Sequence, residues 1–286
     1  MIVDAHAHLC GRPPATGDAH ETDGDPPWER DYTVDELLSQ LAAAGVDRAV
    51  LVGRDPARTG ELLAHADRVA EIAGVVAVRD LAAGGLADEL EALRDLPGGR
   101  HLVAVRYLAR DHDGADHLDA EPVQAGIRVV ADAGLALELA VRPDQLPGVV
   151  RAATRLPDLR IVLDHLGGAR PDAGLPGLAD WLPAARSAAQ WPNVSVKASG
   201  LVTRAGPAWT DEHLRPFVVA ALRLFGPRRV MFGSDWPVCL PAASYARVLA
   251  AVEAVLPVGD DDRREVLGGT AARVYRLPCP GPGAAE

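Results

Sequence analysis

The sequence begins with MIVDAHAHLC, in which Asp4, His6 and His8 stand at alternate positions at the end of an apolar run. Side chains at positions i and i+2 of a β-strand point to the same face. A strand over this segment would therefore aim two imidazoles and a carboxylate in one direction. Neutral imidazole nitrogens and carboxylate oxygens are the donor types that bind Zn²⁺ and similar ions. The His6 and His8 pair alone is also compatible with hydrogen-bonded histidines of the core. The prediction of a metal site therefore depends on further ligand residues.

Two later segments supply such donors. IVLDHLGG holds His165 beside Asp164, and VMFGSDWPV holds Asp235. Taken singly, the first fits a structural histidine and the second an aspartate that caps a turn. If these segments end strands of one sheet, they complete a ligand set for a divalent metal, most simply Zn²⁺, with one position left for water: His6, His8, His165 and Asp235. Asp235 would then take a proton from water and return it to a leaving group, with His165 as its catalytic partner.

Other charged side chains stand on further apolar runs. Arg106 lies in VAVRYL, Glu138 in LALELAV, and Lys197, the only lysine of the chain, in NVSVKAS. Burying a charge is costly unless it is paired, so each of these residues either contacts a substrate or belongs to a structural ion pair. We predict that Arg106, Glu138 and Lys197 bind the substrate. We also predict that Asp4 orients the imidazoles of its own strand, as a supporting carboxylate does in metal sites.

Eight short runs of β character recur at 1–8, 46–53, 75–80, 101–108, 135–141, 159–165, 193–199 and 228–235, and segments of helical period separate them. In the clearest helix, predicted over 33–45, Thr33 and Glu36 suit a capping box and Gly45 suits the C-terminal end. Another helix is predicted over 210–226. The alternation predicts a parallel sheet, and its count favours a closed (β/α)₈ TIM barrel. A doubly wound open sheet is the alternative, although its glycine-rich phosphate turn is missing after the first run.

In such a barrel, the groups at the carboxyl ends of the strands meet at one mouth. The segment from Cys10 to Tyr32 follows the first run and is too long and polar for a simple turn. We predict that it closes over the mouth and that its Trp28 contacts the substrate. We expect one barrel domain over 1–277 and a flexible C-terminal tail, PCPGPGAAE, over 278–286.

The composition of the 286 residues, 48% hydrophobic and 24% charged, is that of a globular protein. A formal net charge of −11 argues against nucleic acid as a partner, because phosphate contacts need clustered Lys and Arg. No apolar run approaches the roughly 18 to 20 residues of a membrane span, and neither a signal peptide nor a disulfide framework is evident. We expect a cytoplasmic protein with a small-molecule substrate. The sequence predicts no oligomeric state.

The segments DAHAH, VLDHLGG, NVSVKASGL and FGPRRVMFGSDWPV together resemble the amidohydrolase superfamily, most closely its group of lactonases acting on sugar acids and on 2-pyrone-4,6-dicarboxylate. The likeness spans nearly the whole chain, in order. It implies an amidohydrolase-type barrel that hydrolyses a cyclic ester at His6, His8, His165 and Asp235. Arg106 matches a substrate-facing Val-Arg-His segment, in which Tyr107 here replaces the histidine. Some members of the group use zinc and others work without a divalent ion, so the resemblance leaves metal dependence open.

The sequence therefore predicts a hydrolase that opens a lactone, most simply a sugar-acid lactone, by attack of water on the ring carbonyl. Two alternatives stay open. One is a metal-dependent decarboxylase or hydratase of the same superfamily, which shares the His-x-His start and the late aspartate. The other belongs to a different class and is a barrel that binds a small molecule without catalysis.

Overall fold

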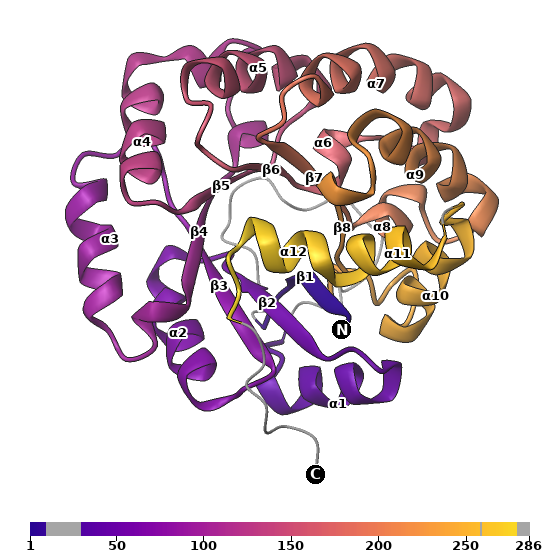
Figure 1. Ribbon diagram of the computed structural model, residues 1–286, viewed down its shortest axis with the longest axis horizontal. Coiled ribbons are helices and arrows are strands. Elements are labelled where there is room, and N and C mark those ends of the chain that lie inside the picture. The colour runs from indigo at the N-terminus through magenta and orange to yellow at the C-terminus, as the bar shows by residue number, and fades with distance from the viewer. Residues whose placement is uncertain (10–29, 258, 279–286) are drawn as a thin grey trace.

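The computed structural model describes residues 1–9, 30–257 and 259–278. Within them, eight parallel strands follow one another around a single sheet in chain order (Figure 1). The strands are β1 (Val3–Ala7), β2 (Arg48–Val52), β3 (Ile72–Val78), β4 (Leu102–Tyr107), β5 (Ala136–Leu139), β6 (Ile161–Leu163), β7 (Val194–Ala198) and β8 (Val230–Phe232). Just beyond β8, Trp236 forms a parallel bridge with Ala7 and closes the sheet. The predicted (β/α)₈ barrel is confirmed, and the doubly wound alternative is wrong.

Helices surround the sheet (Figure 1). Their bounds are α1 (Val34–Ala44), α2 (Thr59–Arg68), α3 (Leu86–Asp95), α4 (Glu121–Asp132), α5 (Leu146–Arg155), α6 (His165–Gly168), α7 (Gly174–Ala189), α8 (Leu201–Ala205), α9 (Asp211–Phe225), α10 (Tyr245–Val255), α11 (Asp260–Arg264) and α12 (Thr270–Val274). The helix predicted over 33–45 is α1, which begins at the Thr33–Glu36 capping box and ends at Gly45, with φ 67°. The helix predicted over 210–226 is α9.

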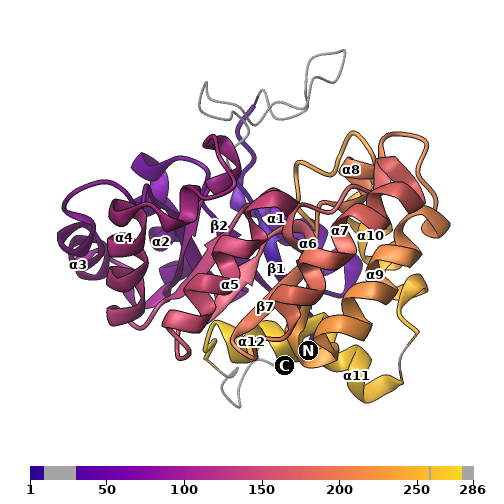
Figure 2. The ribbon, with the colours of Figure 1, turned by 90° about the horizontal axis from the view of Figure 1, so that it is seen from above.

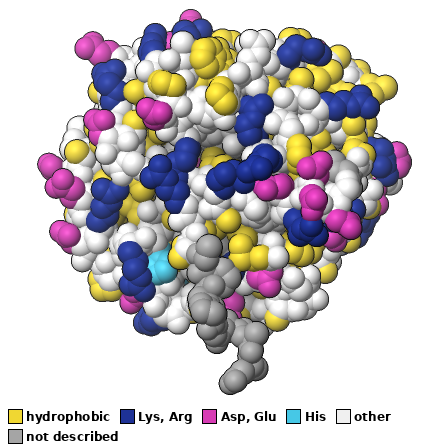
Figure 3. Space-filling model, in the orientation of Figure 1, with side chains coloured by type: hydrophobic (Ala, Val, Ile, Leu, Met, Phe, Trp, Pro, Cys, Tyr) yellow, Lys and Arg dark blue, Asp and Glu magenta, His cyan; other side chains and the backbone are white. Residues whose placement is uncertain are grey.

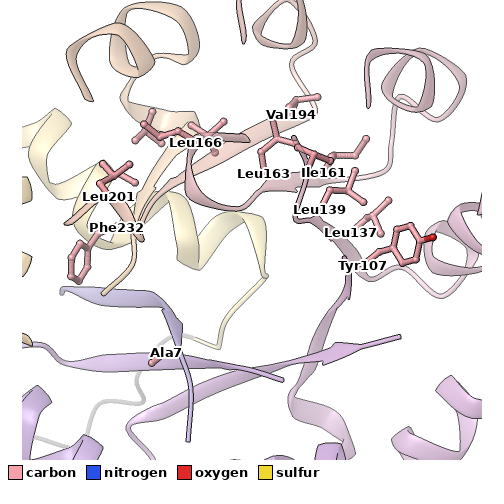
Figure 4. Close-up of a cluster of buried hydrophobic side chains, with 14 of the residues drawn as sticks. Ala7, Tyr107, Leu137, Leu139, Ile161, Leu163, Leu166, Val194, Leu201 and Phe232 are labelled. Carbon is pink, nitrogen blue, oxygen red and sulfur yellow. The ribbon is translucent and has the colours of Figure 1, made fainter. Parts of the chain in front are cut away.

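The strands separate an outer apolar layer from the barrel interior. Outward side chains such as Leu137, Leu139 and Ile161 pack in the large cluster between sheet and helices (Figure 4). Inward positions near the amino ends of the strands belong to a second apolar cluster, which includes Ala104, Ala136 and Val162. Because strand side chains alternate, the next inward positions are polar: Arg106 on β4, Glu138 on β5, and Asp164 directly after β6. The interior therefore changes from apolar to charged toward the carboxyl ends of the strands.

The amino ends of the strands are covered by the end of the described chain. Helix α12 crosses this end of the barrel (Figures 1 and 2), and Ala271, Val274, Tyr275 and Leu277 join the inner apolar cluster. On the outer surface of the same end, acidic and basic side chains are interspersed (Figure 3). Among the described helices, none has both the length and the apolar character needed to cross a membrane.

Two predicted segments fall almost wholly outside the described residues. They are the loop over 10–32, including Trp28, and the tail over 278–286. Closure of that loop over the mouth, contact of Trp28 with a substrate, and the domain boundary at 277 therefore stay predictions.

Gly233 allows β8 to pass close to β1. A Cβ atom at this position would lie 2.7 Å from the Cβ of His6 and 2.9 Å from the Cβ of Ser199. We expect Gly233→Ala to lower the free energy of unfolding by about 1–3 kcal/mol, because overpacking a filled core has this cost. Gly84→Ala is the control, since its Cβ would meet nothing within 4 Å. Urea denaturation measures both variants, and equal unfolding midpoints would contradict this account.

Candidate active site

Four side chains from three strand ends meet at the carboxyl end of the barrel. The ring centroids of His8 and His165 lie 4.8 and 4.9 Å from that of His6. One carboxylate oxygen of Asp235, Oδ1, is 3.6 Å from His6 Nε2 and 3.4 Å from His8 Nε2. The structure thus brings together the four residues that were predicted as metal ligands.

The backbone that carries two of these groups is strained. His165 has φ 50° and Asp235 has φ 57°, a left-handed conformation that costs non-glycine residues about 1–2 kcal/mol. At Asp235 the strand pairing holds this conformation, since its N–H donates to the carbonyl of His6 at 2.8 Å. Gly200 faces both side chains, and a Cβ there would lie 2.6 Å from His165 Nδ1 and 3.1 Å from Asp235 Oδ2. Such strain is typical of functional positions.

His8 turns a nitrogen lone pair toward the carboxylate of Asp235. Its Nδ1 lies 2.7 Å from the carbonyl oxygen of Val52, and a carbonyl can only accept, so Nδ1 carries a proton. In the neutral ring, Nε2 is then an acceptor that points at Asp235 Oδ1, 3.4 Å away. Two acceptors in contact repel each other unless a proton or a cation lies between them. This arrangement therefore fits a bound divalent ion.

Burial and neighbouring charges set the ionisation of the site. Burial lowers the pKa of His165 to about 4 and also lowers the pKa of His8. Burial and the nearby Lys197 ammonium hold the pKa of His6 well below its usual value. Burial alone would raise the pKa of Asp235, but His165, His8 and His6 outweigh this effect and lower it. At neutral pH the site therefore combines neutral imidazoles with an ionised carboxylate.

The same atoms suit a metal ion. His6, His165 and Asp235 each offer a ligand atom, and these atoms all lie within 4.8 Å of one another. His6 Nε2 is buried and makes no hydrogen bond within the described part of the chain. Imidazole and carboxylate donors are those of catalytic zinc sites, so the residues present fit the metal that the sequence predicts.

A layer of buried charges lies directly beneath the histidines. The Lys197 ammonium is 2.8 Å from Glu138 Oε2, 3.3 Å from Asp164 Oδ1 and 3.0 Å from His6 Nδ1. Arg106 Nε donates to Asp164 Oδ2 at 2.7 Å. Glu138 also accepts a hydrogen bond from the Tyr275 hydroxyl at 2.5 Å. This layer holds two cations and two carboxylates.

The predicted substrate residues separate into two groups. Arg106 lines the cavity above the histidines. Lys197 and Glu138 are fully buried and do not line it, because they point into the interior one layer below the mouth and pair with each other. Direct contact of these two side chains with a substrate, which the sequence predicts, does not fit this placement.

Asp4 has a different role from the one expected. Among the described residues, its carboxylate contacts neither imidazole ring, although it accepts a hydrogen bond from the backbone N–H of His6 at 3.0 Å. Its carboxylate accepts hydrogen bonds from the backbone N–H and hydroxyl of Ser234, at 2.9 and 2.5 Å, and from the Tyr245 hydroxyl at 2.9 Å. The groups that support the imidazoles from behind are instead the Val52 carbonyl at His8, Asp164 and Lys197 at His6, and the Ser199 hydroxyl at His165. Asp4 therefore joins β1 to the segment after β8, which keeps Asp235 next to His6.

The cavity above the site, together with the open solvent at its mouth, has an empty volume of about 460 Å³. Its lining is His8, Arg54, Arg106, Arg110, His165, Gly200, Thr203, Arg204, Asp235 and Val238. The sequence interpretation missed three of its arginines. Arg54 follows β2 by two residues and could have been found by the same inspection of strand ends. Arg110 follows β4 by three residues, whereas Arg204 lies on α8 and gives no comparable signal.

The fold and the site together define a hydrolase-type barrel with a histidine and aspartate centre, and the sequence profile of the amidohydrolase family matches residues 3–277. The chain belongs to the amidohydrolase family. Among curated proteins, it is similar to two named L-fucono-1,5-lactonase. The Burkholderia multivorans protein is 37% identical over 98% of this chain and 97% of its own length, and the Burkholderia ambifaria protein is 33% identical over 97% and 96%.

Among solved structures, the chain is similar to a zinc-bound amidohydrolase from Burkholderia multivorans. The two share 32% identity and a TM-score of 0.86, with 97% of this chain and 100% of the other covered. The predicted family and the predicted class of lactone-hydrolysing enzyme are confirmed by these matches.

The buried ion pair of Glu138 and Lys197 supports a stability test. We expect Glu138→Gln to lower the free energy of unfolding by about 3–5 kcal/mol, because it leaves a buried ammonium short of one counter-charge. Glu212→Gln is the matched control, since Glu212 pairs with Arg215 at the surface, where such pairs contribute about 0–1 kcal/mol. Urea denaturation would refute the buried role of the pair if both variants unfolded at the wild-type midpoint.

Proposed function

We propose that this enzyme opens a sugar-acid lactone by hydrolysis of its ring ester. The observation that carries the proposal is the ionised Asp235 carboxylate, held within 3.4–3.6 Å of two imidazole nitrogens at the base of an open cavity. The names of the two Burkholderia relatives support a sugar lactone as the substrate. The cytoplasmic location and the lack of nucleic-acid or membrane partners belong to the same proposal, and rest on composition.

In the proposed reaction, Asp235 takes a proton from a water molecule, and the water oxygen attacks the carbonyl carbon of the ring. Negative charge develops on the carbonyl oxygen. The Arg106 guanidinium, which lines the cavity, and those imidazoles of the histidine cluster that turn an N–H toward the site stabilise that charge, a contribution that is usually large. Protonated Asp235 then delivers its proton to the ring oxygen as the C–O bond breaks. The product is a hydroxy acid.

His6, His8, His165 and Asp235 would hold Zn²⁺. When bound, the ion would lower the pKa of water and polarise the ester carbonyl. His165 and Asp235 would keep their catalytic positions with or without the ion, because backbone contacts and neighbouring side chains hold them. His165 Nδ1 lies 2.9 Å from the Ser199 hydroxyl, and the Asp235 N–H donates to His6.

Arginines would bind the polar groups of the substrate. Four of them line the cavity together with a single carboxylate, that of Asp235, among the described lining residues. Guanidinium groups hydrogen-bond both hydroxyl and carboxylate oxygens. A substrate screen therefore includes both neutral sugar lactones and lactones with a carboxylate substituent. A Trp28 variant belongs in the same screen, because the predicted contact of Trp28 with the substrate lies outside the described residues.

Replacement of the proposed base tests the mechanism. We expect Asp235→Asn to lower kcat/KM for lactone hydrolysis by at least about 100-fold, the lower bound for loss of a general base. Asp211→Asn, which alters a surface ion pair with Arg247, should keep wild-type activity. Circular dichroism checks that both variants fold. A folded Asp235→Asn protein with full lactonase activity would refute the role of Asp235.

A pH-indicator screen over lactones, run with and without a chelator, tests the reaction class and the metal together. We expect acid release without CO₂, loss of at least about 90% of activity after chelation, as for a metal that generates the nucleophile, and recovery on adding Zn²⁺. Release of CO₂ would favour a decarboxylase, and binding without turnover of any lactone would favour a non-catalytic barrel. Full activity in chelator would reject zinc while keeping the hydrolase.

A further inference from the structure

His6 Nδ1 faces two partners that require opposite protonation states. The Lys197 ammonium, 3.0 Å away, can only donate a hydrogen bond. The Asp164 carboxylate oxygen Oδ1, 3.3 Å away, can only accept one. All three side chains have 0% exposure, so bulk water does not compete at this contact. The imidazole can satisfy one partner at a time.

The charges around His6 favour a neutral ring. Lys197 and Arg106 are balanced by Glu138 and Asp164, which they contact at 2.8 and 2.7 Å. Since these pairs leave no net charge in the layer, a further positive charge on a fully buried imidazole would be costly. The other carboxylate that faces His6 is Asp235, which is farther away, 3.6 Å from Nε2, and is shared with His8. The ring therefore carries one proton, on either Nδ1 or Nε2, and the partner of Nδ1 decides which.

Each choice gives His6 a different function. If Nδ1 accepts from Lys197, the proton is on Nε2, which then donates into the site where Asp235 Oδ1 lies 3.6 Å away. If Nδ1–H donates to Asp164, the lone pair of Nε2 faces the site. Only this second form can bind a metal through Nε2.

The unsatisfied atoms of the site correspond to this choice. With Lys197 donating to His6, three buried atoms of this layer and the site make no hydrogen bond within the described residues: His6 Nε2, Asp164 Oδ1 and Glu138 Oε2. Glu138 Oε2 has the Lys197 ammonium at 2.8 Å, and Asp164 Oδ1 has it only at 3.3 Å, so His6 Nε2 and Asp164 Oδ1 are the two atoms that the tautomer affects. Both gain partners in the second form, since Asp164 Oδ1 receives the Nδ1 proton and Nε2 meets a cation. Of the two bonding patterns, only the one that requires a metal therefore gives both atoms a partner.

We propose that Lys197 and Asp164 act as opposing positioning residues that set the tautomer of His6: Lys197 favours the hydrogen-bond donor and Asp164 favours the metal ligand. The only lysine of the chain thereby lowers the affinity of the site for a divalent ion. The inference rests on the proposed function, because it concerns the same site. Its test measures the tautomer of His6 and the affinity for Zn²⁺, and does not measure lactone turnover.

The first measurement is ¹⁵N NMR of histidine-labelled wild-type protein, which distinguishes the two tautomers by the shifts of Nδ1 and Nε2. His6→Gln identifies the His6 signals. We expect the Nε2–H tautomer in chelator-treated protein and the Nδ1–H tautomer after addition of Zn²⁺. The Nδ1–H tautomer in both samples, a doubly protonated His6 in metal-free protein, or no change with Zn²⁺ would overturn the proposal.

The second measurement is Zn²⁺ affinity, by competition with a chromogenic chelator. The double variant Lys197→Met with Glu138→Gln removes the donor and keeps the charge balance, and we expect it to bind Zn²⁺ about tenfold more tightly, the equivalent of one hydrogen bond. We expect Asp164→Asn to bind about tenfold more weakly, as for loss of a group that orients a metal ligand. Wild-type affinity in both variants would overturn the proposal.

Controls separate these effects from damage to the core. Tyr275→Phe removes a hydrogen bond to Glu138 in the same layer without touching His6, and should leave the Zn²⁺ affinity and the His6 tautomer unchanged. Glu138→Gln alone shows how much of the change in Zn²⁺ affinity of the double variant comes from this substitution. If a variant fails to fold, the wild-type spectra decide the proposal. Absence of lactonase activity in the wild type would refute the proposed function and leave these readouts intact.

Discussion

The cost of burying charge governs this site. Beneath the mouth of the barrel, an ammonium and a guanidinium meet two carboxylates with almost no access to solvent. Such a layer is tolerable only when every charge has a partner at close range. The pairing fixes the strand positions of Arg106, Glu138, Asp164 and Lys197 relative to one another. It also gives the imidazoles above a rigid polar floor, so the geometry of the histidine and aspartate centre depends on it.

A second constraint is the seam where the barrel closes. There Asp4 accepts hydrogen bonds from Ser234 and Tyr245, and the backbone after β8 pairs with β1. Asp235 and the two histidines of the first strand come from opposite ends of the sequence, so this seam determines their distance. The left-handed conformation of Asp235 is supported by the same contacts, which offset its local strain.

The sequence was informative wherever the signal was local. Apolar runs located all eight strands, and the types of His6, His8, His165 and Asp235 indicated a metal-type centre before any geometry was known. The sequence was less informative about roles that depend on how far below the mouth of the barrel a side chain lies. Lys197 and Arg106 both stand on strands, yet one lies below the mouth and the other lines the cavity. The hydrogen-bond partners of Asp4 and the position of Arg204 at the cavity depend on which distant segments of the chain meet. Spacing along the sequence does not contain that information.

The burial of Lys197 has a practical consequence. Because it is the only lysine and has no exposed surface, reagents that acylate lysine amines have no lysine target on the native protein. An amine inside the barrel becomes reactive only when the strands separate, an opening whose free energy approaches that of global unfolding in core elements. The rate at which this one side chain is labelled would therefore report the opening of the barrel core, without an introduced probe.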